Sequence, residues 1–135
     1  MGEYSFGRKE HLKSRKDIAR LFKERQSIGV YPFRLFWLEV DEEASQEFPL
    51  LIAFSVPKKN FRKAWARNAV RRRIHEVYRL AKPRLYQSLQ SKNKRLIGML
   101  LYVAKDNKQS FNHLQYKFER VCDRLLQELS SSPSK

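Results

Sequence analysis

The sequence lacks the features on which several classes of protein depend. One cysteine, Cys122, stands among 135 residues, so no internal disulfide can form, and a lone thiol fits a reducing compartment. No run of about eighteen apolar residues is present, which excludes a transmembrane helix. The first residues contain no apolar core of a signal peptide. We therefore expect a cytoplasmic protein.

Catalytic and metal-binding signatures are also missing. The sequence contains no His-Glu-x-x-His motif, no paired Cys/His set and no glycine-rich phosphate loop. The three histidines are scattered and lack the spacing of zinc ligands. The acidic residues in the middle of the chain cluster over 41–47, which we interpret as an exposed connector. We expect no catalytic or metal site made by the protein alone, and we expect Cys122 to be buried packing.

Negative charge is scarce compared with positive charge. The 29 lysines and arginines outnumber 14 acidic residues, the net charge is +15 and the pI is about 10.2. Self-repulsion of this size destabilises a compact chain, so we expect a neutralising partner, which could be nucleic acid, an anionic membrane or an acidic protein. The length suits one domain. We place it at residues 14–129, after a basic extension over 1–13 and before a disordered tail over 130–135.

Hydrophobic periodicity predicts helices packed on a small sheet in an α+β domain. We expect helices over about 15–25, from about 66 to a stop near Pro83, and over 111–129. We expect strands over 30–40, 50–56 and 96–104, with a turn at Ile28-Gly29. The strand over 30–40 is apolar on both sides, so each face of the sheet should be covered by other groups.

The helix from Arg67 to Arg79 carries the strongest functional signal. Between Lys58 and Arg84, eleven of 27 residues are basic and only Glu76 is acidic. At about 100° per residue the apolar side chains share one side of the helix. The polar side chains fan out beside that stripe: Arg67, Asn68, Arg71, Arg72, His75 and Arg79. Few acids are placed to offset the repulsion between like charges, which favours phosphate binding over a merely solvated helix face.

Aromatic residues could either fill the core or stack on nucleobases. The candidates are Phe22, Phe33, Phe36, Trp37, Phe54, Phe61 and Trp65. Any single one is more often a core residue. A sheet with two apolar faces beside a basic helix nevertheless suits single-stranded nucleic acid, in which each stacked base contributes about 1–3 kcal/mol. We expect Phe22 and Phe36 to line such a cleft.

Two groups of motifs point to a known family. One is Ser55-Val56-Pro57-Lys58-Lys59 followed by the segment from Ala64 to Arg79, with its Arg67-Asn68 pair. The other is His11-Leu12-Lys13-Ser14 followed by Asp17-Ile18 and Phe22. From about Phe6 to Leu129 the sequence resembles the protein subunit of bacterial ribonuclease P. Three positions depart from the family pattern: Ala69 and His75 replace arginines, and Ile18 stands where an aromatic residue is usual.

The resemblance implies both a fold and a function. The implied fold is a two-layer sandwich in α-β-β-β-α-β-α order, like the second domain of ribosomal protein S5, with a small mixed sheet and a left-handed crossover. It has one strand more than the residues alone predict, and general rules favour a right-handed crossover. The implied function is to assist a catalytic RNA in the endonucleolytic removal of the 5′ leader from precursor tRNA. Magnesium would be held by the RNA, and the catalytic groups would reside there too.

The resemblance also implies partners and site residues. The partners are the catalytic ribonuclease P RNA and the 5′ leader, with one monomeric protein per RNA and no membrane. A cleft between the sheet and the basic helix, lined by Phe22, Phe36 and Arg67, would hold the leader. The surface for the catalytic RNA would comprise Lys58, Lys59, Arg62, Arg67, Asn68, Arg71, Arg72, His75 and Arg79.

Three other functions remain open at this point. A ribosomal or other structural RNA-binding protein would share the basic helix but would not need the aromatic cleft. A DNA-binding regulator would use the same helix for recognition, although a strand precedes it rather than a tight helix-turn-helix partner. A self-sufficient nuclease would need a cluster of carboxylates, which the sequence does not offer.

Overall fold

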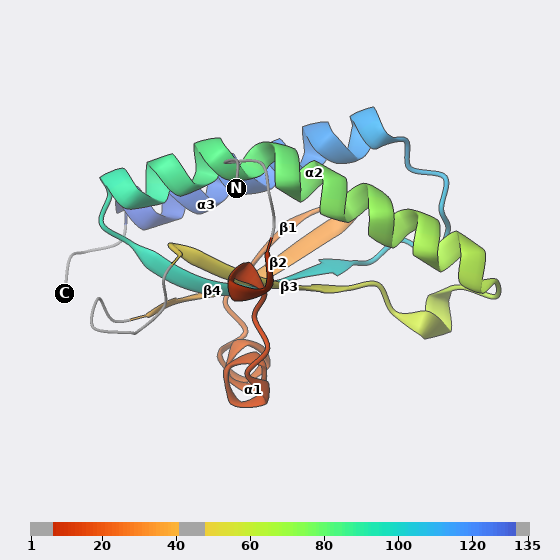
Figure 1. Ribbon diagram of the computed structural model, residues 1–135, viewed down its shortest axis with the longest axis horizontal. Helices are drawn as coiled ribbons and strands as arrows, with labels where there is room; N and C mark the ends of the chain where they lie inside the picture. Colours follow the sequence, from red (N-terminus) through yellow and green to blue (C-terminus); the bar gives the residue numbers. More distant parts are fainter. Residues whose placement is uncertain (1–6, 41–47, 132–135) are drawn as a thin grey trace.

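The computed structural model describes residues 7–40 and 48–131 (Figure 1). Their order confirms the α-β-β-β-α-β-α arrangement implied by the resemblance. The helices are α1 (Arg15–Glu24), α2 (Ala64–Ser91) and α3 (Phe111–Ser131), with single 3-10 turns η1 (Arg8–Glu10) and η2 (Lys58–Asn60). The strands are β1 (Ser27–Val30), β2 (Phe33–Val40), β3 (Leu50–Ser55) and β4 (Arg95–Tyr102). The expected connector over 41–47 lies outside the described residues.

The strands form one mixed sheet in the order β1-β2-β4-β3. β1 pairs antiparallel with β2, and β2 pairs antiparallel with β4. β3 and β4 run parallel, and α2 connects them by the left-handed crossover that the resemblance implies (Figure 1). The general preference for a right-handed connection is therefore overridden in this fold.

Helices cover both faces of the sheet, as the two-sided apolar strand predicts. α2 and α3 lie together over one face, and α1 lies on the other face (Figure 1). Phe33, Leu35 and Trp37 of β2 point into the larger core under α2 and α3. Phe36 and Leu38 point the other way, into a smaller cluster with α1. The alternation along β2 thus builds a two-layer sandwich with α1 added below it.

The predicted turn at Ile28-Gly29 is wrong, because both residues belong to β1. Ile28 is fully buried, and Gly29 pairs with Arg34 across the ladder. A Cβ atom added at Gly29 would lie 2.6 Å from the Arg34 guanidinium, whose Nη1 donates to the Ser27 hydroxyl at 2.8 Å. Glycine here makes room for an arginine on the neighbouring strand, and the turn itself falls at residues 31–32.

The predicted end of the basic helix near Pro83 is also wrong. α2 continues through Pro83 to Ser91. Proline removes one backbone donor and strains a helix interior. On either side of it, however, Tyr78, Leu85 and Leu89 are buried in the core, so tertiary packing holds the helix together. None of the described helices is long and apolar enough to cross a membrane.

The segment before α1 is tied to the free edge of β3. The Leu12 amide donates to the Ile52 carbonyl at 2.9 Å, and His11 forms a parallel bridge with Ile52. Ser14 then caps α1 by accepting from the Asp17 amide at 3.2 Å. Residues 7–13 of the expected basic extension therefore belong to the fold.

Candidate nucleic-acid interface

The first half of α2 is anchored on one side and displays cations on the other. Val70 and Ile74 are buried in the core, whereas the side chains of Arg71 and Arg72 are exposed. Neither arginine carries a resolved ion pair among the described residues. Rigid, exposed guanidinium groups of this kind suit bidentate contacts to phosphate.

Arg67 joins the start of this helix to the end of β3. Its Nε donates to the Val56 carbonyl at 2.7 Å, and the residue is half-buried. This bond fixes the direction in which the remaining guanidinium nitrogens project. Arg79 is held differently, because its Nε donates to Glu76 Oε2 at 3.0 Å. That hydrogen bond lowers the pKa of Glu76 and neutralises part of the charge of Arg79.

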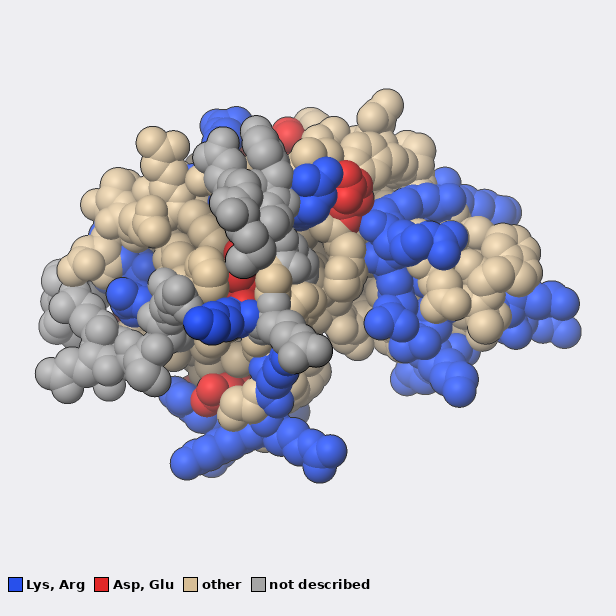
Figure 2. Space-filling model, in the orientation of Figure 1, with Lys and Arg blue, Asp and Glu red and all other residues tan. Residues whose placement is uncertain are grey.

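The loop before α2 adds cations to the same end of the molecule. Lys58, Lys59 and Arg62 are exposed. Phe61, which stands among them, packs inward, with its ring stacked 6.3 Å from that of Tyr102. Figure 2 shows lysine and arginine side chains gathered at this end of the molecule. We call the exposed residues of η2, the following loop and the first half of α2 the α2 basic surface.

Arg73 belongs to the basic run but has a structural role. Its Nη1 donates to the carbonyls of Asn107 and Gln109 at 2.7 and 3.3 Å. These bonds hold the loop that leads into α3 against α2. Sequence alone gives no signal that this arginine faces a loop some 35 residues later, while its neighbours face solvent.

His75 lies at the side of the α2 basic surface that faces β3. Its ring is 4.6 Å from Phe54 and 6.2 Å from His11. Burial lowers its pKa, and the charges of His11 and Arg71 lower it further, so the imidazole is mainly neutral at pH 7. Burial and the charge of Lys13 lower the pKa of His11 as well. Sequence reasoning missed His11 because only the bridge to β3 brings it here.

Phe22 and Phe36 meet on the other face of the sheet. Their ring centroids are 5.1 Å apart, and Phe22 is 44% exposed. The cleft was expected between the sheet and the basic helix, but α2 packs on the face opposite to Phe36. The ring pair instead lies where α1 meets β2. Arg67 does not belong to this pair, because it bonds to Val56 at the end of β3 and β4 lies between β3 and β2.

A second group of cations covers α1. Arg15, Lys16, Arg20 and Lys23 are exposed, and Leu21 anchors the helix from its buried side. Figure 2 shows this group below the sheet, separate from the α2 basic surface. The predicted interface did not include it, although the periodic spacing of Ile18, Leu21 and Phe22 already implied which side of the helix faces solvent.

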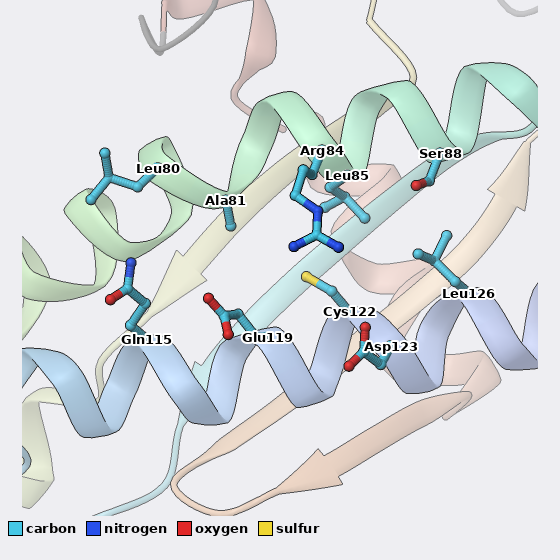
Figure 3. A pocket seen from close by; sticks show the side chains of 10 residues that line it. All are labelled: Leu80, Ala81, Arg84, Leu85, Ser88, Gln115, Glu119, Cys122, Asp123 and Leu126. Carbon is cyan, nitrogen blue, oxygen red and sulfur yellow. The ribbon is translucent and has the colours of Figure 1, made fainter.

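A groove of about 190 Å³ lies between α2 and α3 (Figure 3). Its lining is mixed and includes Leu85, Leu126, Arg84, Glu119, Cys122 and Asp123. Burial of the sulfur raises the pKa of Cys122 to about 12, so the thiol stays protonated. The residue packs against the core but is half-buried rather than buried, because it also lines this groove. Within residues 7–40 and 48–131, no three His, Cys, Asp or Glu side chains gather as a metal site.

Comparisons with known proteins point to one family. A family model described as Ribonuclease P matches residues 6–126. The ribonuclease P protein component of Porphyromonas gingivalis is 29% identical over 133 residues, 98% of this chain and 94% of the relative. That of Dictyoglomus turgidum is 32% identical over 90 residues, 67% of this chain and 71% of the relative.

A solved structure shows the same fold. The Staphylococcus aureus RNase P protein superposes with a TM-score of 0.66 at 18% identity, covering 86% of this chain and 94% of that one. The family model extends across η2, the following loop and the first half of α2, which form the α2 basic surface. The chain therefore belongs to the family of ribonuclease P protein components.

Proposed function

We propose that this chain, as the protein component of ribonuclease P, binds the catalytic RNA through the α2 basic surface. The observation that carries the proposal is the pair Arg71 and Arg72, exposed on a helix whose opposite side is buried. Lys58, Lys59 and Arg62 extend the same surface. Guanidinium and ammonium groups fixed in this way bind a phosphate backbone and do not read base edges.

We propose further that the Phe22–Phe36 pair on the α1 face holds the single-stranded 5′ leader of precursor tRNA. Phe22 leaves much of its ring open to solvent, and Phe36 supports that ring from the sheet. Exposed cations are present on the same helix as Phe22. Aromatic stacking beside backbone neutralisation is the usual arrangement for binding a single strand with weak sequence preference.

The chemistry of the surface bears on where magnesium would be held. Lysine and arginine line the α2 basic surface, and they repel a divalent cation while attracting phosphate oxygens. Magnesium in the assembled enzyme is therefore assigned to the RNA and not to a site of the protein alone. Once bound, the lysine and arginine side chains of the protein would lower the repulsion between RNA phosphates near that metal.

We also propose that one protein binds each RNA and that the protein is located in the cytoplasm.

Reconstitution tests the proposal. Purified protein is added to the cognate catalytic RNA and precursor tRNA at a magnesium concentration chosen so that the RNA alone cleaves slowly, and release of the 5′ leader is followed. Restored cleavage is expected. Cleavage by the protein without the RNA, or no effect of the protein on the RNA, would contradict the proposal. The alternative of a purely structural RNA-binding protein predicts binding without any change in cleavage.

Salt dependence provides a second test. If the surface neutralises about six phosphates of single-stranded character, log K should fall against log salt with a slope near −4. Replacing Arg71 by alanine should make that slope shallower by about 0.7. A binding constant that does not change with salt would exclude the electrostatic account.

A further inference from the structure

We propose that Trp65 is a base-stacking residue whose indole receives an unpaired nucleobase of the catalytic RNA. The inference extends the proposed function, because it assigns a second kind of contact to the α2 basic surface. Trp65 lies in the first turn of α2 and is 66% exposed, more than any other large hydrophobic residue among those described. An indole this exposed forfeits the hydrophobic stabilisation that burial would give it.

The position of Trp65 on the helix points it away from the core. At about 100° per residue, it lies opposite the stripe formed by Val70 and Ile74. Asn68 and Arg72, one and two turns further on, share its outward side, and both are exposed. The indole thus stands in line with groups that contact phosphate. Ala69, also one turn away, adds only a methyl group beside the ring.

Other aromatic residues show that the chain buries such rings where they serve the core. Trp37, the other tryptophan, is 4% exposed in the centre of the sheet. Phe61, only four residues before Trp65, turns inward and stacks on Tyr102. The exposure of Trp65 therefore does not follow from a shortage of interior positions at this end of the molecule.

The charges around Trp65 indicate the chemistry of its partner. Lys58, Lys59, Arg62 and Lys63 precede it and are exposed, and the first turn of α2 contains no acidic residue. The amino end of the helix adds partial positive charge from its unpaired amides. A polyanion is attracted here, while an aromatic face is presented at the same point. RNA with an unstacked base satisfies both requirements, because the base stacks on the ring while its phosphates meet the cations.

The source of the base follows from the layout of the two surfaces. Trp65 lies on the α2 basic surface together with Lys58, Lys59 and Arg72, and we assign this surface to the catalytic RNA. The Phe22–Phe36 pair, assigned to the leader, lies on the opposite face of the sheet from α2. Bases inside a duplex are stacked on their neighbours above and below and leave no open face for the indole. We therefore assign to Trp65 a bulged or looped-out base of the catalytic RNA.

Substitution of Trp65 tests the assignment through affinity. Trp65→Ala should weaken binding of the catalytic RNA about tenfold, equivalent to about 1.4 kcal/mol. Trp65→Phe should keep most of the affinity, since phenylalanine also stacks. Neither variant should change the slope of log K against log salt, because the indole carries no charge. Tyr116→Ala is the matched control, because Tyr116 is an aromatic residue on α3 that is 56% exposed, and its affinity should equal that of the wild type.

Tryptophan fluorescence tests whether RNA contacts Trp65 and which RNA supplies the contact. Because Trp37 is buried, quenching on RNA binding should come from Trp65 and should disappear in Trp65→Phe. Catalytic RNA should quench the wild type, and a leader oligonucleotide alone should not. Circular dichroism should show an unchanged helical content for each variant, because the position is exposed and alanine favours helix.

The outcomes separate this inference from the proposed function. A wild-type protein that fails to bind the catalytic RNA overturns both. Normal, salt-dependent binding together with full affinity in Trp65→Ala overturns only the stacking assignment. Quenching by the leader and not by the catalytic RNA also overturns it. A shallower salt slope in Trp65→Ala would show that the substitution disturbs the neighbouring cations rather than a stacked base.

Discussion

The two halves of α2 differ in whether their positively charged side chains are exposed or buried. In the first half, Arg71 and Arg72 are exposed, and the residues around them are mainly basic. In the second half, Lys82 is only 4% exposed and its Nζ lies 2.7 Å from Glu10 Oε1. Tyr86 donates to the same oxygen at 2.8 Å. One helix thus presents cations for a partner and, two to three turns later, buries one completely.

The difference shows what determines whether a charged side chain of this protein is buried or exposed. A buried ammonium group is tolerated only when a counter-charge and hydrogen bonds replace its water. Burial tends to raise the pKa of Glu10, but hydrogen bonds from Lys82, the Gly7 amide and Tyr86 outweigh it, so the pKa lies below its usual value. Within residues 7–40 and 48–131, Arg71 and Arg72 form no such ion pair and are exposed to solvent, where they are available to an external anion.

Removing the buried counter-charge should give the largest effect. Glu10→Gln leaves Lys82 buried without a counter-charge, which should lower the free energy of unfolding by about 3–5 kcal/mol. Urea denaturation at pH 7 measures the loss. In the double variant Glu10→Gln with Lys82→Met, no charge remains unpaired, and most of the stability should return. A Glu10→Gln protein as stable as the wild type would contradict the account.

The same substitution has a pH dependence of known sign. Because folding lowers the pKa of Glu10, its contribution is complete above the ordinary value of 4.5 and is lost as the pH falls through the lower, folded-state value. The stability difference between wild type and Glu10→Gln should therefore be constant near neutrality and shrink in acid.

Reversing the charge of the exposed half should abolish assembly without unfolding the chain. Arg71→Glu combined with Arg72→Glu replaces two attractive phosphate contacts by repulsive ones, so the affinity for catalytic RNA should fall at least about 100-fold, near 2.7 kcal/mol. Gel-shift titration measures the affinity. An unfolded protein by circular dichroism would show that these residues are not on the solvent side of the helix.

Loss of an exposed ring should affect the leader selectively. Phe22→Ala removes the outer member of the Phe22–Phe36 pair and should weaken binding of precursor tRNA with a leader by about 1–3 kcal/mol. Binding of mature tRNA, which has no leader, should not change. Equal losses for both substrates would show that Phe22 supports the fold rather than the single strand.

The smallest expected effect concerns His75. Its pKa is lowered in the free protein, whereas a bound phosphate would favour the protonated imidazole. Binding would then take up a proton, and affinity should rise as the pH falls from 8 to 6. A change of half a pKa unit corresponds to about threefold in affinity. His75→Gln should remove most of this slope, with any remainder assigned to His11.

Periodic features of this fold were readable from the sequence, whereas long-range ones were not. The apolar stripe through Val70 and Ile74 is buried as its spacing predicts, and β2 alternates as its residues predict. β1 was missed because Gly29 looks like a chain breaker. Its carbonyl accepts from Arg124 of α3 at 2.8 Å, a contact between residues far apart in the chain that no local pattern reveals.

The candidate site was predictable to a similar extent. Basic residues at helical spacing indicated which side of α2 would be exposed. The predicted set includes Arg72 and leaves out Arg73, but nothing in the sequence indicated that Arg73 binds the carbonyls of a distant loop. Nor could composition distinguish Trp37, which is buried, from Trp65, which is not. These differences depend on what the rest of the chain places nearby.

The attachment of residues 10–12 sets the position of α1 relative to α2, and so of the cations that each helix carries. Glu10 is held by α2, Leu12 is hydrogen-bonded to β3, and α1 begins shortly afterwards at Arg15. These contacts keep the cations of α1 at a fixed distance from those of α2. An RNA that contacts both groups of cations must present phosphates at the same spacing. The protein can therefore discriminate between RNAs by their shape without contacting base edges.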